Sequence, residues 1–145
     1  MATPTQLDVR GPRFGAAVTT VVLAVAFVSA GTTLATILLL LQTVAFGIGA
    51  VVGPHAQPYG KFFATVIRPR ISPATKFEDA APPRFAQAVG LGFAVAALAG
   101  IFLNSIALTQ IAVGLALAAA FLNAAFSFCL GCEMYLLIRR FTTSS

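Results

Sequence analysis

The chain has 145 residues, of which 59% are hydrophobic and only 9% are charged, and its mean hydropathy is +0.94. A composition this apolar excludes a water-soluble domain and indicates an integral membrane protein whose main partner is the lipid bilayer. The formal net charge of +5 does not indicate nucleic-acid binding, because the basic residues flank apolar segments, where anionic lipid headgroups account for them.

The apolar residues fall into four blocks, and crossing a bilayer takes roughly 20 residues. The blocks run over residues 14–30, 33–52, 86–103 and from 106 onward. Only Gly31-Thr32 separates the first two blocks, and only Asn104-Ser105 separates the last two. Because unpaired strand edges are not tolerated in lipid, we expect an all-α polytopic membrane protein with four transmembrane helices in two antiparallel hairpins.

The basic residues predict the orientation of these helices. All nine Lys and Arg lie in the N-terminal arm (1–13), in the connection between the hairpins (53–85) or in the C-terminal segment (129–145). The positive-inside rule therefore predicts that both termini and the connection are cytoplasmic. The two transmembrane hairpins occupy residues 14–52 and 86–128.

The same short motif precedes each hairpin: PRFGAAV at residues 12–18 and PRFAQAV at residues 83–89. The register that aligns these motifs also pairs Ala26 with Ala97 without a gap. Since each unit would cross the membrane twice, this pattern predicts two parallel repeats of one hairpin. Chance similarity between Ala- and Val-rich segments is the alternative.

The Pro-Arg-Phe motif has a plain role as an anchor. Pro suits the first turn of a helix, Arg13 and Arg84 would lie at headgroup depth, and Phe14 and Phe85 would begin the apolar face. The basic residues before the first apolar block also resemble a cleaved signal peptide. We favour a retained helix, because the apolar run is long for a signal peptide and the second copy of the motif cannot be one.

The central connection begins with a break at Gly53-Pro54. Apolar residues between Tyr59 and Arg68 then recur at helical spacing, with Lys61 beside them. This pattern predicts a short helix that lies in the membrane interface.

Three polar side chains interrupt the spans: Gln42, Gln110 and Asn123. A polar side chain that faces lipid costs free energy, so we expect each one to point into the bundle and to form hydrogen bonds there. Adhesion between helices is the simpler interpretation. A path for a polar substrate is the alternative.

Both cysteines, Cys129 and Cys132, lie near the cytoplasmic end of the fourth span in the stretch FCLGCEMY. On a helix, a spacing of three puts both sulfurs on one face, as a disulfide or a shared metal requires. If the helix continues to Arg140, its negative end and Glu133 disfavour a thiolate. If it breaks near Ser127, Cys129 caps a new helix whose N-terminus favours a thiolate.

The sequence leaves that choice open, although Gly131 favours a break or a close approach. In the reducing cytosol we expect a dithiol. Reactive thiols, burial as small apolar residues, and a metal site formed by Cys129, Cys132 and His55 are the three interpretations. No phosphate-binding loop and no Ser–His–acid set is present, so we expect no cofactor. We favour a protein that is not an enzyme, although the sequence leaves enzymatic activity open.

The stretches RGPRF, APPRFAQAVG and FCLGCEMY resemble a family of small bacterial integral membrane proteins catalogued as domain of unknown function 4395. The likeness runs from Arg10 to Arg140. The family pattern marks Arg84, Phe85, Cys129, Gly131 and Cys132. The resemblance implies a bacterial cytoplasmic membrane and, since relatives are often encoded near thioredoxin-like and sulfurtransferase proteins, a thiol or sulfur context.

Our leading hypothesis is that Cys129 and Cys132 exchange electrons or a sulfur atom with a cytosolic thioredoxin-like or sulfurtransferase partner. A second hypothesis is a soft-metal or sulfur-anion transport component, with Gln42 or Asn123 along the path. A third is a non-catalytic membrane subunit with inert cysteines. The small size favours a homo-oligomer or a larger membrane assembly.

Overall fold

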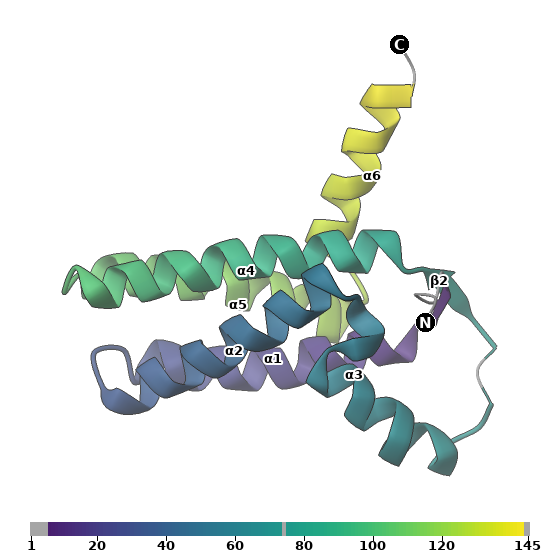
Figure 1. Ribbon diagram of the computed structural model, residues 1–145, viewed down its shortest axis with the longest axis horizontal. Coiled ribbons are helices and arrows are strands. Elements are labelled where there is room, and N and C mark those ends of the chain that lie inside the picture. Colours follow the sequence, from purple (N-terminus) through teal and green to yellow (C-terminus); the bar gives the residue numbers. More distant parts are fainter. Residues whose placement is uncertain (1–5, 74, 144–145) are drawn as a thin grey trace.

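The computed structural model describes residues 6–73 and 75–143. Four long helices lie side by side along the longest axis of the molecule (Figure 1), namely α1 (Arg10–Val28), α2 (Thr33–Val51), α4 (Ala81–Phe102) and α5 (Ile106–Phe126). Each is long and apolar enough to cross a membrane. The prediction of an all-α protein with four such helices is confirmed.

Two of these helices begin earlier than the hydropathy predicted. α1 begins at Arg10, where we expected the span from residue 14, and α4 begins at Ala81, where we expected it from residue 86. Proline explains the difference, because the first turn of a helix does not use its backbone N–H groups. The chain therefore becomes helical before it becomes apolar, and both Pro-Arg-Phe motifs are part of helices.

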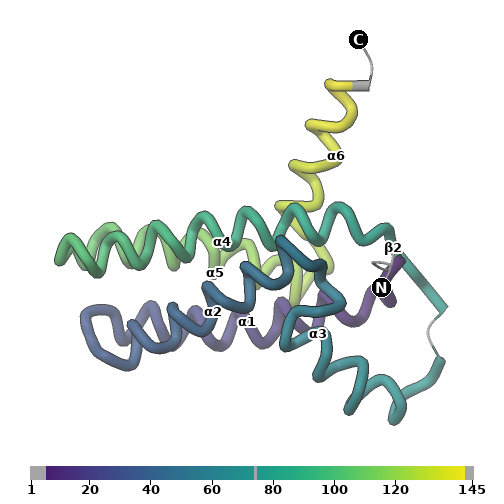
Figure 2. Tube along the Cα trace, in the orientation of Figure 1, coloured from purple at the N-terminus to yellow at the C-terminus, as the bar shows by residue number. Residues whose placement is uncertain are grey.

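Short polar turns join α1 to α2 and α4 to α5 at one end of the bundle (Figure 2). The hydroxyls of Thr32 and Ser105 accept backbone N–H groups from the first turns of α2 and α5, at 3.3 and 3.2 Å. Gly31 and Asn104 have positive φ values of 89° and 57°. This left-handed conformation lets the chain reverse within a few residues.

Helices of the first half of the chain pack against helices of the second half as well as against each other. The most extensive contacts join α1 to α5 and α2 to α4. The buried core where the helices meet consists of Leu23, Ala26, Leu39, Ala97, Ala112, Val113 and Ala116. Small side chains let helix backbones approach closely, which favours helix association inside a bilayer.

Two further helical segments leave the bundle at the end opposite the short turns (Figure 2). The lateral segment after α2 comprises η1 (Pro54–Ala56), α3 (Pro58–Phe62), η2 (Phe63–Ile67) and η3 (Arg68–Arg70). The segment after α5 is α6 (Leu130–Thr143), which runs across the bundle axis (Figure 1). Both segments therefore lie outside the four long helices.

A two-stranded antiparallel ribbon, β1 (Gln6–Asp8) with β2 (Phe77–Asp79), lies at the same end. The sequence analysis did not predict these strands, because three residues show too little alternation to indicate a strand. The hydrogen bond from the Arg10 guanidinium holds the pKa of the Asp8 carboxyl below its ordinary value, although burial opposes this effect. Burial raises the pKa of Glu78 on the facing strand.

Candidate functional site

The chain breaks between α5 and α6, which settles the choice that the sequence left open. α5 ends at Phe126, and Ser127 adopts the left-handed conformation with a φ of 56°. The N–H groups of Ser127 and Phe128 donate to carbonyls in the last turn of α5, at 3.0 and 3.2 Å. α6 then begins at Leu130, so the fourth long helix does not continue to Arg140.

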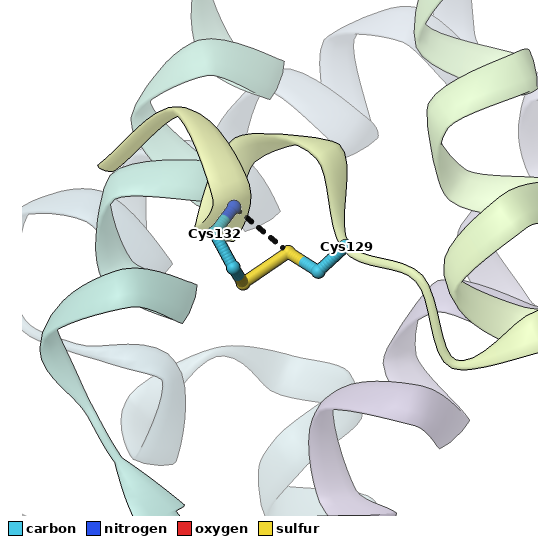
Figure 3. Close-up of a disulfide and its surroundings, with 2 residues drawn as sticks. All are labelled: Cys129 and Cys132. Atoms are coloured by element: carbon cyan, nitrogen blue, oxygen red, sulfur yellow. Dashed lines mark hydrogen bonds between the residues drawn. A yellow bond between two sulfur atoms is a disulfide. The ribbon is translucent and has the colours of Figure 1, made fainter. Parts of the chain in front are cut away.

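Cys129 and Cys132 form a disulfide at the first turn of α6 (Figure 3). Their Cα atoms are 5.1 Å apart, which is within the usual range for a disulfide. The Sγ atom of Cys129 also accepts the backbone N–H of Cys132 at 3.1 Å, so this sulfur acts as the N-cap of α6. Both residues are half-buried, and each keeps part of its surface exposed.

The position of Cys129 favours a thiolate in the reduced pair. In the reduced pair, the N–H of Cys132 and the positive end of the α6 dipole would both stabilise a negative charge on the Sγ atom of Cys129. Glu133, in the first turn of α6, acts in the opposite direction. The structure shows the oxidised form of the pair, and the dithiol that we predicted for a cytosolic location is the reduced form of the same couple.

α6 is held against the start of α4 by a close backbone contact. A Cβ atom on Gly131 would come within 2.6 Å of the Cα atom of Ala86, so only glycine allows this approach. The rings of Phe85 and Tyr135 pack with their centroids 5.8 Å apart. Phe85 of the second Pro-Arg-Phe motif therefore contacts the helix that carries the disulfide.

The arginines of the two motifs cap helices from the opposite half of the chain. The Arg13 guanidinium donates to the carbonyls of Ala124 and Ala125 at the end of α5, at 3.0 and 3.5 Å. The Arg84 guanidinium donates to the last two carbonyls of α2, at 2.8 and 2.6 Å. Helix C-termini leave such carbonyls without partners and carry negative dipole charge.

We predicted these arginines to be headgroup anchors, and sequence reasoning missed their role as caps. The only signal was the repetition of the motif, which cannot show which helix end each arginine reaches. Phe14 of the first motif packs its ring against Phe62 and Phe63, with centroids 5.9 and 5.8 Å away. It thereby holds the lateral segment after α2 against α1.

The polar residues of the spans differ in their surroundings. Gln42 is fully buried, donates to the Thr19 hydroxyl at 3.4 Å and accepts from the Tyr59 hydroxyl at 2.7 Å. Gln110 is half-buried and donates to a backbone carbonyl of α1 at 3.3 Å. Asn123 is half-buried in the last turns of α5, and no side-chain hydrogen bond joins it to the described residues.

The structure does not bring His55 to the cysteines. His55 lies in η1, after the end of α2, and its Nδ1 atom is buried without a hydrogen-bond partner in the described part of the chain. Within residues 6–73 and 75–143, no three His, Cys, Asp or Glu side chains lie close enough to hold a metal ion. The predicted site of Cys129, Cys132 and His55 is therefore not assembled in this structure.

Together these features define a small polytopic helical protein with four helices that could span a membrane and a cysteine pair at the start of a lateral helix. The chain belongs to the family described as domain of unknown function (DUF4395), which matches residues 7–140. That description names no activity. Neither the curated proteins nor the solved structures contain a match to the chain.

Proposed function

We propose that this protein presents a redox-active cysteine pair at the membrane surface. The pair undergoes thiol–disulfide exchange with a cytosolic thioredoxin-like protein or sulfurtransferase. One observation carries the proposal: the sulfur of Cys129 is the N-cap of α6 and bonds to the N–H of Cys132, with both residues partly exposed. A helix N-terminus favours the thiolate, which is the reactive form in exchange. Cysteines that only fill a core do not need this position.

The exchange can be written as two balanced steps. A thiolate of the reduced partner attacks the Sγ atom of Cys129, the disulfide breaks, and Cys132 leaves as a thiolate that takes up a proton. The second thiolate of the partner attacks the partner's own sulfur in the mixed disulfide, and Cys129 leaves to the stabilised N-cap position. The cysteine pair gains two electrons and one proton, Cys129 remains a thiolate at the N-cap, and the partner becomes a disulfide.

We place this exchange on the cytoplasmic side of a bacterial inner membrane, with both termini and the central connection on that side. The distribution of basic residues supports this orientation. On α6, Met134 and Phe141 are exposed and Phe141 is followed by polar residues only. At about 100° per residue, Cys132 lies on the opposite side of α6 from both, so an α6 that rests on lipid directs Cys132 toward water.

We also propose that residues 59–68 form an interfacial helix and that the four long helices are two parallel repeats of one hairpin. The exposed Phe62 beside the basic Lys61 supports the first of these proposals. The reciprocal caps made by Arg13 and Arg84 support the second, because equivalent arginines make equivalent contacts. The small size of the bundle favours a homo-oligomer or a larger membrane assembly.

The test uses two single variants, Cys132→Ser and Cys129→Ser, in membrane vesicles of both orientations. We expect an impermeant maleimide to label the reduced pair only from the cytoplasmic face. With Cys132→Ser, the thiolate of Cys129 should attack a thioredoxin whose resolving cysteine is replaced and whose remaining cysteine carries a thionitrobenzoate group, so that thionitrobenzoate leaves and a stable mixed disulfide forms on Cys129. Cys129→Ser is the matched control and should form far less of this adduct, because Cys132 lies outside the cap position.

Two outcomes would overturn the proposal. If neither variant forms an adduct and neither face labels, the cysteines are inert packing residues. If Cu(I) or Zn(II) protects the reduced thiols while no adduct forms, the pair is a soft-metal site of the transport hypothesis.

A further inference from the structure

A cavity of about 230 Å³ lies between the β-ribbon, the first turns of α1 and α4, and the lateral segment after α2. Neither cysteine lines this cavity. Pockets for drug-sized ligands are roughly 300–1,000 Å³, so this cavity fits a smaller chemical group. Much of its wall is apolar, with Leu7, Pro12, Phe63, Phe77 and Pro83.

Three polar side chains in the wall have hydrogen-bonding capacity that the described residues do not use. Gln57 accepts two backbone N–H groups with its Oε1 atom, at 2.9 and 3.2 Å, so the group left to it is the donor Nε2. Gln87 buries its Oε1 atom against Gly49 without a hydrogen bond, which leaves its Nε2 atom. His55 buries an unpartnered Nδ1 atom, which leaves its Nε2 atom.

The wall contains the charged residues Asp8 and Arg68, and Arg10, which lies beside the wall, already pairs with the Asp8 carboxylate. The Asp8 carboxylate is bonded by Arg10 through Nε at 3.1 Å and through Nη2 at 2.9 Å. The Nε atom of Arg68 lies 3.8 Å from the same carboxylate, which is beyond hydrogen-bond distance. Two guanidinium groups therefore face one carboxylate, and Arg68 keeps donors for another acceptor.

Because Arg10 already pairs with the one carboxylate of the wall, the groups left over are donors from Arg68, Gln57, Gln87 and His55, and such donors match a ligand made of acceptors. We propose that this cavity binds the oxyanion of a phosphate group, with Arg68, His55 and the amide Nε2 atoms of Gln57 and Gln87 as its donors. The apolar wall would hold the carbon portion of the same molecule. The phosphate can belong to the headgroup of an anionic lipid or to a free phosphate compound, since both present the same oxygens.

The experiment follows thermal unfolding of the purified full-length protein in dodecyl maltoside. One arm titrates sodium phosphate against sodium chloride at equal ionic strength. The other arm adds phosphatidylglycerol to the micelles, with diacylglycerol as the control that has the same tails without phosphate. We expect the unfolding temperature to rise and saturate with phosphate in the first arm if the ligand is a free anion, or only with phosphatidylglycerol if it is a lipid.

Variants connect that response to the cavity. Arg68→Gln, His55→Leu and Gln87→Met should each weaken binding roughly tenfold or more, since a hydrogen bond to a charged group is worth about 1.5–3 kcal/mol. Arg70→Gln is the matched control, because Arg70 is exposed in η3 and does not line the cavity. It should leave binding unchanged.

Gln87→Met distinguishes a ligand site from a structural defect. Gln87 buries an oxygen without a hydrogen-bond partner, so its replacement by Met should not lower the unfolding temperature. If Gln87 only packs in the structure and does not contact the ligand, the variant should also keep the parent's response to ligand. A ligand site predicts the same stability without ligand and a lost response. If neither phosphate nor phosphatidylglycerol raises the unfolding temperature beyond its control, or if Arg70→Gln is affected as much as Arg68→Gln, the proposal is wrong.

Discussion

The two lateral segments, residues 54–70 and α6, are fixed to the bundle in similar ways. Each contains a glycine with no room for a side chain, but the partners differ. A Cβ atom on Gly60 would come within 2.6 Å of the Pro54 carbonyl oxygen in the same segment, whereas one on Gly131 would come within 2.6 Å of Ala86 in α4. Each also packs an aromatic ring against the phenylalanine of a Pro-Arg-Phe motif. An aromatic contact to the bundle is therefore common to the two segments, whereas only α6 also makes a close glycine contact with the bundle.

The segments differ in the atom that caps the helix. The amide oxygen of Gln57 caps α3, whereas the sulfur of Cys129 caps α6 and is also bonded to Cys132. An amide cap has one chemical state under cellular conditions, whereas a sulfur cap can be oxidised or reduced. The comparison indicates that the aromatic contacts are structural in both segments and that, of the two caps, only the one at α6 has two redox states.

The largest effect is expected from filling the two glycine contacts. Gly131→Ala and Gly60→Ala should each lower the free energy of unfolding by about 1–3 kcal/mol, because a methyl group would overlap the facing backbone. Thermal or denaturant unfolding in detergent measures this change. Gly92→Ala is the control: nothing lies within 4 Å of its added Cβ atom, so it should be neutral or slightly stabilising.

The same variants separate the two segments. Gly131→Ala should also speed maleimide labelling of the reduced cysteines, because it displaces α6 from α4, whereas Gly60→Ala should leave the labelling rate unchanged. Equal labelling rates in the two variants would mean that the contact at Gly131 does not control access to the cysteines.

Reduction should loosen one segment and not the other. Dithiothreitol opens the disulfide, so we expect amide hydrogen exchange at residues 130–135 to become severalfold faster while residues 58–63 do not change. In the doubly substituted Cys129→Ser, Cys132→Ser protein, these amides should exchange as fast as in the dithiol form and should not respond to dithiothreitol. A response at residues 58–63 of similar size would mean that reduction disturbs the whole end of the bundle.

Removal of either arginine cap should have a smaller effect. Arg13→Gln and Arg84→Gln leave the last carbonyls of α5 and α2 to water, and each should lower the free energy of unfolding by about 1 kcal/mol, since both side chains are exposed. Arg70→Gln is the control. Only Arg13→Gln should also change the labelling of Cys129, because its partner carbonyls directly precede the break.

The smallest effect is expected from the two carboxyls of the β-ribbon, Asp8 and Glu78. Protonation of one lowers the stability of the fold and protonation of the other raises it. The lowered pKa of Asp8 stabilises the fold above the unfolded pKa, and this contribution is lost as the pH falls through the folded pKa. The raised pKa of Glu78 gives the reverse: protonation removes the penalty of a buried charge, so stability is gained as the pH falls. Asp8→Asn should make the ribbon less sensitive to acid, and Glu78→Gln should make it more sensitive, in hydrogen exchange between pH 7 and pH 3.

Much of the architecture follows from the sequence because bilayer crossing depends on the length and polarity of a segment. Local composition predicts the four long helices and their short turns. It also indicates that Gly131 permits a close approach of another helix. The sequence also identified Cys129 and Cys132 as the candidate pair. It could not choose between a continuous helix and a break, since serine has no intrinsic preference for the left-handed conformation that Ser127 adopts in the folded chain.

The tertiary structure decided which distant groups meet. The caps made by Arg13 and Arg84 lie more than a hundred and more than thirty residues from their carbonyls along the chain, and no local pattern encodes such pairings. The β-ribbon and the cavity beside it likewise combine segments from both halves. The separation of His55 from the cysteines has the same cause: similar depth in a membrane does not fix position around a bundle, which depends on how the helices pack.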